Sequence, residues 1–337
     1  MNGFWSRALN LGMVAACMAT ASLLALSGCT SVKVKLGMKV YLAKIPVASI
    51  AATLPKGPGI APGEKSALVV VVTEPDGKVL QTEGKGKGKV MWKDLSITTT
   101  VVTANKKGIL SFPHDPRKTD GKLGHITITI PSHPDIKTEL DIPVRYNFNF
   151  VSNFSGSNGN NGSDGIAGSD GMSGSPGSTD PNNPSAGGDG SSGGNGTDGS
   201  NGGNGGDAPP VQIRMTLRAG SHPLLQVGVT AAGHQKLYLV DPQGGSLTVR
   251  ADGGQGGSGG KGGRGGRGGS GGSGTPSGNS GSDGSSGQDG SNGSNGRGGA
   301  ITVTYDPQAK PYLAVLRLSN VGGPKPVLNE EAVAPLW

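Results

Sequence analysis

Residues 253–274 read GGQGGSGGKGGRGGRGGSGGSG, with glycine at every third position and a second glycine beside it in nearly every triplet. The same period of three recurs in residues 156–177, 187–205 and 278–299. Only a residue without a side chain can face a close neighbour once per turn of a three-residue helix, so this period predicts left-handed extended helices. The phase breaks between the four stretches, which we number runs one to four in chain order.

The lengths of the runs predict two long hairpins. A run of about 22 residues is about 70 Å long, at about 3.1 Å per residue. Turn-forming residues join run one to run two at 179–186 and run three to run four at 275–277. Runs of nearly equal length that are joined in this way can lie side by side as one bundle.

Three architectures compete for these runs. A collagen triple helix needs three chains and draws stability from proline, yet Pro176 is almost alone within the runs. A polyglycine-II bundle, in which three-residue helices of one chain bond directly to one another, needs no proline. A disordered linker would not keep strict phase over four matched runs. The sequence therefore favours an intramolecular bundle and a monomer, with run three the most enclosed and run one the most exposed.

Charged residues in the runs leave two interpretations open. Lys261, Arg264 and Arg267 recur every three residues and so share one ridge of run three. This ridge is a candidate anion-binding site for polysaccharide or nucleic acid. Aspartates recur at multiples of three in runs one and four, so pairing of opposite charges between ridges is the favoured interpretation. No aromatic residue is interleaved for base stacking, and no nucleic-acid partner is expected.

Outside the runs, the sequence alternates in the manner of short β-strands. Stretches such as 67–72 and 125–130, separated by turn signals, predict a β-sandwich. Pro62-Gly63-Glu64-Lys65 before an apolar strand resembles the opening of bacterial immunoglobulin-like modules. The expected fold class is mostly β. It comprises an N-terminal immunoglobulin-like β-sandwich and a second small β unit that carries the polyglycine-II-type bundle, with little or no α-helix after the leader.

The predicted domains follow from these changes of pattern. They are a signal peptide (1–28), a lipidated N-terminus with the β-sandwich (29–150), runs one and two (151–207), a β unit (208–252), runs three and four (253–299), and strands that complete the second unit with a proline-rich tail (300–337). The tail from Gly322 onward is expected to be loosely ordered.

The leader ends in a lipidation motif. Arg7 precedes an apolar stretch over 8–26 that is too short for a spanning helix and is typical of a signal peptide. The stretch ends in Leu26, Ser27, Gly28 and Cys29, which match the lipobox of bacterial lipoproteins. This resemblance implies that cleavage leaves Cys29 as an acylated first residue. Several acyl chains give stable anchoring in a membrane, and loss of Cys17 with the leader leaves no disulfide.

Lysine is concentrated in the first part of the mature chain. The prominent members are the cluster Lys85, Lys87, Lys89 and Lys93 and the pair Lys106 and Lys107. With an anchor at Cys29, this basic end is the membrane-proximal one. Attraction to an anionic lipid or lipopolysaccharide surface is one interpretation, and an ordinary solvated lysine-rich face is the favoured one.

No pattern in the sequence predicts catalysis or a bound cofactor. The histidines are scattered without the spacing of metal ligands. No cysteine nucleophile, serine elbow or carboxylate pair beside a histidine is present in the sequence. Residues 193–201 nearly fit a nine-residue calcium repeat, but Ser200 holds its aliphatic position and the flanking period is three. We expect no enzyme activity, metal or cofactor.

The combination of a lipobox, a β module and Gly-x-y triplets resembles bacterial collagen-like or glycine-rich lipoproteins. The resemblance implies a structural or adhesive lipoprotein of the cell envelope. Thr30 after Cys29 fits sorting to the outer membrane of a Gram-negative bacterium, with the rod in the periplasm or outside. Expected partners are the membrane, through the acyl chains, and a polysaccharide or another cell-surface protein. The alternative is a carbohydrate- or polymer-binding envelope module.

Overall fold

The computed structural model describes residues 30–218, 220 and 222–337, and the fold class is mostly β with little helix, as predicted. The chain divides into two compact units between Tyr146 and Asn147. Each unit buries apolar side chains of its own.

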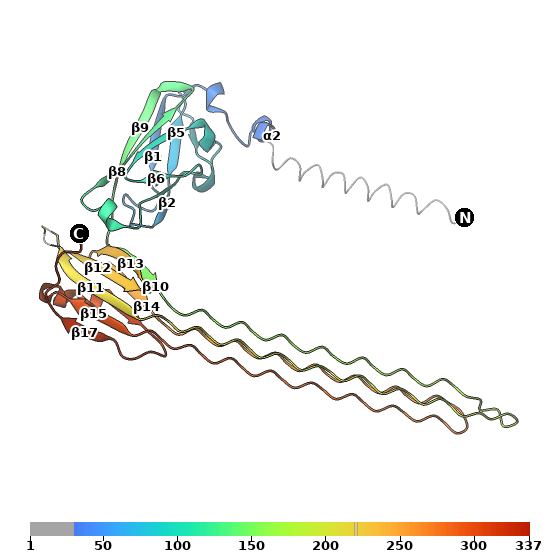
Figure 1. Cartoon of the computed structure of the whole chain (residues 1–337). Coiled ribbons are helices and arrows are strands. Elements are labelled where there is room, and N and C mark those ends of the chain that lie inside the picture. The colour runs from blue at the N-terminus through green and yellow to red at the C-terminus, as the bar shows by residue number, and fades with distance from the viewer. Residues whose placement is uncertain (1–29, 219, 221) are drawn as a thin grey trace, which may run out of the picture. The chain divides into compact units, whose positions relative to one another are not determined.

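The first unit consists of short strands and single-turn helices (Figure 1). Its elements are α2 (Thr30–Lys35), η1 (Leu42–Lys44), β1 (Ser49–Thr53), β2 (Lys65–Ala67), β3 (Val69–Thr73), β4 (Val79–Gln81), η2 (Gly84–Gly86), η3 (Trp92–Asp94), β5 (Ser96–Thr100), β6 (Thr103–Ala104), β7 (Ile109–Ser111), η4 (Pro116–Lys118), β8 (Leu123–Ile130) and β9 (His133–Pro143), where η denotes a 3-10 helix. They form three antiparallel sheets in the orders β1-β3-β4, β2-β7-β6 and β5-β8-β9.

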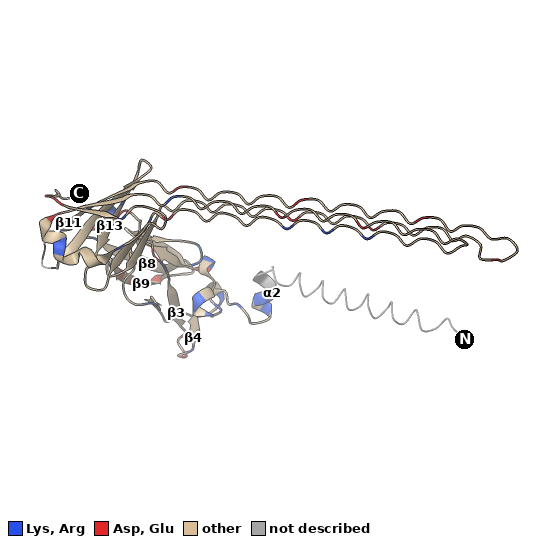
Figure 2. Cartoon of the chain, turned by 90° about the horizontal axis from the view of Figure 1, so that it is seen from below, with Lys and Arg blue, Asp and Glu red and all other residues tan. Residues whose placement is uncertain are grey.

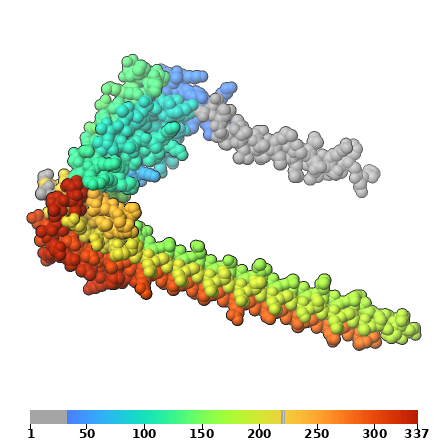
Figure 3. Space-filling model, viewed as in Figure 1, coloured from blue at the N-terminus to red at the C-terminus, as the bar shows by residue number. Residues whose placement is uncertain are grey.

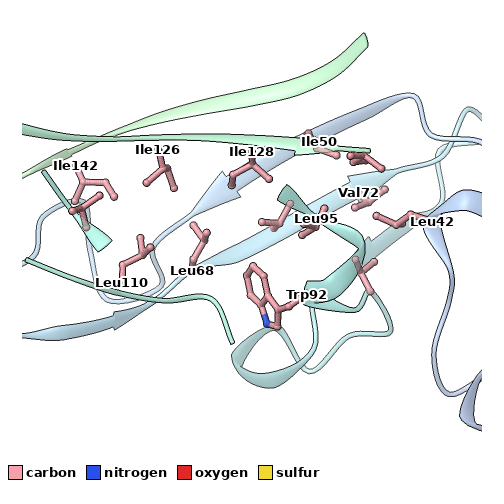
Figure 4. Packing of buried hydrophobic residues seen from close by; sticks show 14 of the residues in the cluster. Leu42, Ile50, Leu68, Val72, Trp92, Leu95, Leu110, Ile126, Ile128 and Ile142 are labelled. Atoms are coloured by element: carbon pink, nitrogen blue, oxygen red, sulfur yellow. The ribbon is translucent and has the colours of Figure 1, made fainter. Parts of the chain in front are cut away.

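One apolar core holds the first unit together. The alternation in β8 buries Ile126, Ile128 and Ile130, because successive side chains of a strand point to opposite faces. Trp92 joins this core, and Figure 4 shows its indole among the buried aliphatic side chains. Gly108, with φ of +67°, lies against the indole, and a Cβ at this position would overlap the ring.

The second unit contains two sheets and the four runs. Its elements are β10 (Asn149–Asn153), β11 (Val211–Arg218), β12 (Leu224–Ala231), β13 (His234–Val240), β14 (Ser246–Arg250), β15 (Ile301–Tyr305), η5 (Pro307–Val315), β16 (Leu316–Ser319) and β17 (Val327–Glu330). One sheet has the order β10-β14-β16 and is parallel throughout. The other has the order β13-β12-β11-β15-β17, with parallel pairing among β11, β15 and β17.

Two predictions about this unit are wrong. The first domain does not extend to residue 150, because Phe150 lies in β10 and β10 pairs with β14 of the second unit. The tail is not loose, since β17 pairs with β15. Its end is held by Gln226, whose Oε1 accepts the Leu336 N–H at 2.9 Å and whose Nε2 donates to the Trp337 carbonyl at 3.3 Å.

Each run continues a strand of one of these sheets. Run one follows β10 and run three follows β14, while run two leads into β11 and run four into β15 (Figure 1). Runs one and three therefore leave from neighbouring parallel strands, and runs two and four return to another such pair. Figure 3 shows the four runs packed into one rod.

The sheets set the register of the rod. β10 pairs with β14 at a separation of 97 residues, as in Asn149 with Ser246, and Asn158 binds Gln255 at the same separation of 97. β11 pairs with β15 as Val211 with Ile301, and Asp207 binds Arg297 at the matching separation of 90. The spacing imposed by strand pairing is thus carried along the runs.

Candidate functional site: the glycine rod and its surface

Backbone hydrogen bonds join the runs along their whole length. Run one donates to run three, as from Gly165 N–H to the Lys261 carbonyl at 2.7 Å. Run three donates to run two, run four donates to run three, and run two donates alternately to runs one and four. Runs two and three therefore contact three neighbours each and form the centre of the rod, whereas runs one and four contact two.

This arrangement explains the doubled glycines. The second glycine of each run-three triplet is buried, and a Cβ on Gly263 would overlap the Ile166 carbonyl group. Runs one and four carry two side chains in almost every triplet, and these side chains are exposed. The prediction that run three is the most enclosed is confirmed, and run one shares the most exposed position with run four.

Asparagine and aspartate side chains cap backbone amides of neighbouring runs. Run three is capped from both sides, by Asn158, Asn161, Asp164 and Asp170 of run one and by Asp283, Asp289, Asn292 and Asn295 of run four. Run four is capped from run two by Asp189, Asn195, Asp198, Asn201, Asn204 and Asp207. These bonds recur at multiples of three residues, so the caps hold adjacent runs in phase with one another.

Hydroxyl groups cap the amides between runs one and two. Ser191, Thr197 and Ser200 of run two each accept a run-one N–H at 2.7 Å. Gly203 occupies the same row of run two, and a Cβ on it would lie 3.2 Å from the Asn160 nitrogen. This row therefore accepts small side chains, unlike the row of triplet glycines beside it.

The predicted cationic ridge is present but is flanked by acids. Lys261, Arg264 and Arg267 are exposed on one row of run three. Within the described residues no ion pair joins them to an aspartate, so the predicted pairing between ridges is wrong. The flanking carboxylates instead accept backbone N–H groups of run three; they are Asp164, Asp170, Asp283 and Asp289. Blue and red segments accordingly lie close together along the rod in Figure 2, and the row has no excess of positive charge.

The two turns meet at the far end of the rod. Ser178 N–H donates to the Ser185 hydroxyl at 2.7 Å, and Ser185 N–H donates back to the Ser178 carbonyl at 3.0 Å. Thr275 N–H donates to the Ser185 carbonyl at 2.9 Å, which ties the second turn to the first. Residues 179–186 are exposed. The tip therefore presents turn residues to solvent on a braced base.

Asp252 forms a junction between the sheets and run three. Its Oδ1 accepts the Ser319 hydroxyl at 2.6 Å and the Val321 N–H at 2.8 Å, while its own N–H donates to the Ser155 hydroxyl at 3.2 Å. The bond from Ser319, assisted by the Val321 amide, lowers the pKa of Asp252 below its usual 3.8. The ionised carboxylate therefore stabilises the start of the rod.

Acid is expected to weaken this junction. A carboxyl group whose pKa is lower in the folded state stabilises the fold above its unfolded pKa, and that contribution is lost as the pH falls through the folded pKa. We expect the free energy of unfolding of the second unit to decrease once the pH is below about 4. Asp252→Asn should make this decrease with pH less steep. Chemical unfolding measured from pH 6 to pH 2 checks this expectation, and equal slopes in both proteins would contradict it.

The first unit has a surface hollow of about 320 Å³. Its lining combines an indole, aliphatic side chains and two lysines: Trp92, Lys93, Leu95, Ile97, Ala104, Asn105 and Lys106. No local motif in the sequence indicates this hollow, because its residues come from η3, β5, β6 and the segments beside them. Since Trp92 is only 8% exposed, a ligand in this hollow would meet mainly aliphatic side chains and the two lysines, which would suit the acidic groups of a polysaccharide.

The predicted lipidation residues Leu26, Ser27, Gly28 and Cys29 lie outside the described residues. In the part of the chain that is described, no helix is long and apolar enough to cross a bilayer. Nor does any group of three His, Cys, Asp or Glu side chains in that part suit a metal ion. Comparisons with protein-family models, with curated proteins and with solved structures find no match to this chain.

Proposed function

We propose that this protein is a membrane-anchored lipoprotein of the cell envelope with a structural or adhesive role. The observation that supports the proposal best is the hydrogen-bonded rod, which holds one braced tip far from the sheets it starts from. Backbone bonds in every triplet make such a rod stiff, and its polar caps leave few apolar groups exposed. A stiff polar spacer with a terminal loop suits display at a surface.

Lipidation at Cys29 is the first element to test. In cells fed a fatty-acid analogue, we expect the wild-type protein to be labelled and to fractionate with the outer membrane. Cys29→Ser should lose the label and the membrane association, whereas Cys17→Ser in the leader should keep both. An unlabelled wild-type protein would refute the anchor. If the protein is labelled, protease treatment of whole cells shows on which side of the outer membrane the rod lies.

The adhesive role is tested at the tip. We expect the mature chain with Cys29→Ser to bind purified envelope material, and replacement of residues 179–184 by glycine and serine to abolish binding. A matched variant with the same number of serines at exposed positions of run four should bind like wild type. Binding that survives the tip replacement would argue against tip adhesion and leave the structural role.

The hollow beside Trp92 supports the alternative, a polymer-binding module. Immobilised cell-wall and capsular polysaccharides would then retain the chain, and the pair of substitutions Lys93→Gln and Lys106→Gln would weaken retention. The row of Lys261, Arg264 and Arg267 supports this alternative less well, because four aspartates flank it.

A further inference from the structure

We infer that the end of the first unit that carries α2 docks on the surface of an anionic phospholipid bilayer. The face, which we call the basic face, comprises Lys33, Lys35, Leu36, Met38, Lys85, Lys87 and Lys89. The inference rests on the proposed anchor at Cys29, which immediately precedes Thr30 at the start of α2. An acylated Cys29 would place this end of the unit against the bilayer.

Packing brings the two halves of the basic face together. Val40 N–H donates to the Lys89 carbonyl at 3.0 Å, and Val40 forms a parallel bridge with Val90. Lys39 Nζ lies 2.8 Å from Glu83 Oε2. The segment that follows α2 therefore lies along the loop that carries Lys85, Lys87 and Lys89.

The acids of these two segments do not offset the lysines. Residues 30–44 contain no acid, and residues 83–94 contain only Glu83 and Asp94. Glu83 pairs with Lys39 and accepts the Trp92 N–H, and Asp94 accepts the Leu42 N–H at 3.2 Å. Partial burial raises the pKa of Glu83, but the hydrogen bonds from Lys39 and Trp92 outweigh this effect, and the pKa is lowered overall. Lys85, Lys87 and Lys89 remain exposed and form no ion pair in the described chain.

Two large apolar side chains lie between lysines of this segment and are exposed to solvent. Leu36 is 65% exposed and Met38 is 56% exposed. Exposed apolar groups among lysines are typical of surfaces that lie at a bilayer interface, where the apolar groups enter the acyl boundary and the cations meet anionic headgroups.

The opposite end of the same unit provides a matched control. In Figure 4, Leu42 of η1 and Ile142 of β9 lie at opposite ends of the core. Exposed lysines also occur near the Ile142 end, at Lys56, Lys118 and Lys122. None of these three lysines belongs to the basic face. Neutralising them therefore lowers the net charge by the same amount as neutralising Lys85, Lys87 and Lys89, but leaves the basic face unchanged.

The test uses the full mature chain with Cys29→Ser, so that acyl chains contribute nothing. We expect it to sediment with phosphatidylglycerol vesicles at low salt, to be released at high salt, and not to bind phosphatidylcholine vesicles. Lys85→Gln, Lys87→Gln and Lys89→Gln together should weaken binding about a hundredfold. Leu36→Ser with Met38→Ser should also weaken it, whereas Lys56→Gln with Lys118→Gln and Lys122→Gln should stay within about twofold.

The failures can be told apart. No binding to phosphatidylglycerol vesicles, equal losses in the two lysine triples, or binding only to vesicles that contain lipopolysaccharide would overturn the docking inference. An unlabelled Cys29 in cells would instead refute the proposed anchor, even if the purified chain still bound vesicles. Circular dichroism of each variant checks that the sheets remain folded.

Discussion

Gly202→Ala is expected to destabilise the rod by more than about 3 kcal/mol, whereas Gly203→Ala, one residue later, should change its stability by less than about 1 kcal/mol. Gly202 is a triplet glycine, and a Cβ there would overlap the Gly257 carbonyl group. The overlap is with backbone, which cannot move without breaking bonds between runs two and three. Gly203 faces run one, where a Cβ would lie 3.2 Å from the nearest atom, the Asn160 nitrogen.

A hydroxyl group at position 203 should form a stabilising hydrogen bond with run one. Serine or threonine at equivalent positions of this row caps run-one amides, as Ser200 does for Ser163. Gly203→Ser should therefore cap the Asn160 N–H and stabilise the rod by up to about 1 kcal/mol. Hydrogen exchange of the run-two and run-three amides measures these changes locally. Equal protection in the variants at 202 and 203 would show that the runs are not packed as described.

The period of three was enough to predict the helices of the rod and their mutual packing within one chain. The period is a local property, because each triplet needs one glycine at its contact with an adjacent run, whichever run that is. The doubled glycines of run three also predicted its central position, because a run with more neighbours has room for fewer side chains. Which runs are parallel neighbours was not predictable locally, since the pairing of β10 with β14 joins residues 97 apart.

The caps were missed although the sequence contains a signal for them. Asn158, Asn161, Asp164 and Asp170 all occupy the third place of a run-one triplet. Read as a polar coat, they indicate only solubility. Their role appears once run three lies alongside, with an amide facing each of them. Aspartate in this row therefore binds backbone, and charge pairing with Lys261 or Arg267 was the wrong inference.

The error at β10 has a similar origin. Residues 136–150 form one alternating stretch, and periodicity alone cannot show that the chain passes from one unit to the next within it. Both β9, with 11 residues, and β10, with 5, continue the same alternation, and only their partners, β8 and β14, show that they belong to different units. The tail was misjudged because its prolines suggested disorder, whereas Gln226 binds its last two residues.

Deletion of Ala167 alone is expected to detach the far half of run one, whereas deletion of the whole triplet 165–167 should leave a folded rod. Loss of one residue shifts the phase, so Ser169, Met172 and Ser175 would replace the next three triplet glycines at the inward positions. A Cβ at those positions overlaps run-two carbonyl groups. The bonds that run one makes from Gly168 to Gly177 would be lost.

Removal of a full triplet keeps every later glycine in phase, so run one can move along its neighbours by one repeat of about 9 Å. Backbone bonds re-form, and the cost is confined to mismatched caps and a stretched turn at the tip. We expect hydrogen exchange beyond residue 168 to approach the unprotected rate after the single deletion and to stay slow after the triplet deletion. Since both proteins lose Ala167, that residue's own contacts cannot account for a difference. Equal protection would mean that phase does not hold the rod together, and a disordered or trimeric arrangement of the runs would have to replace it.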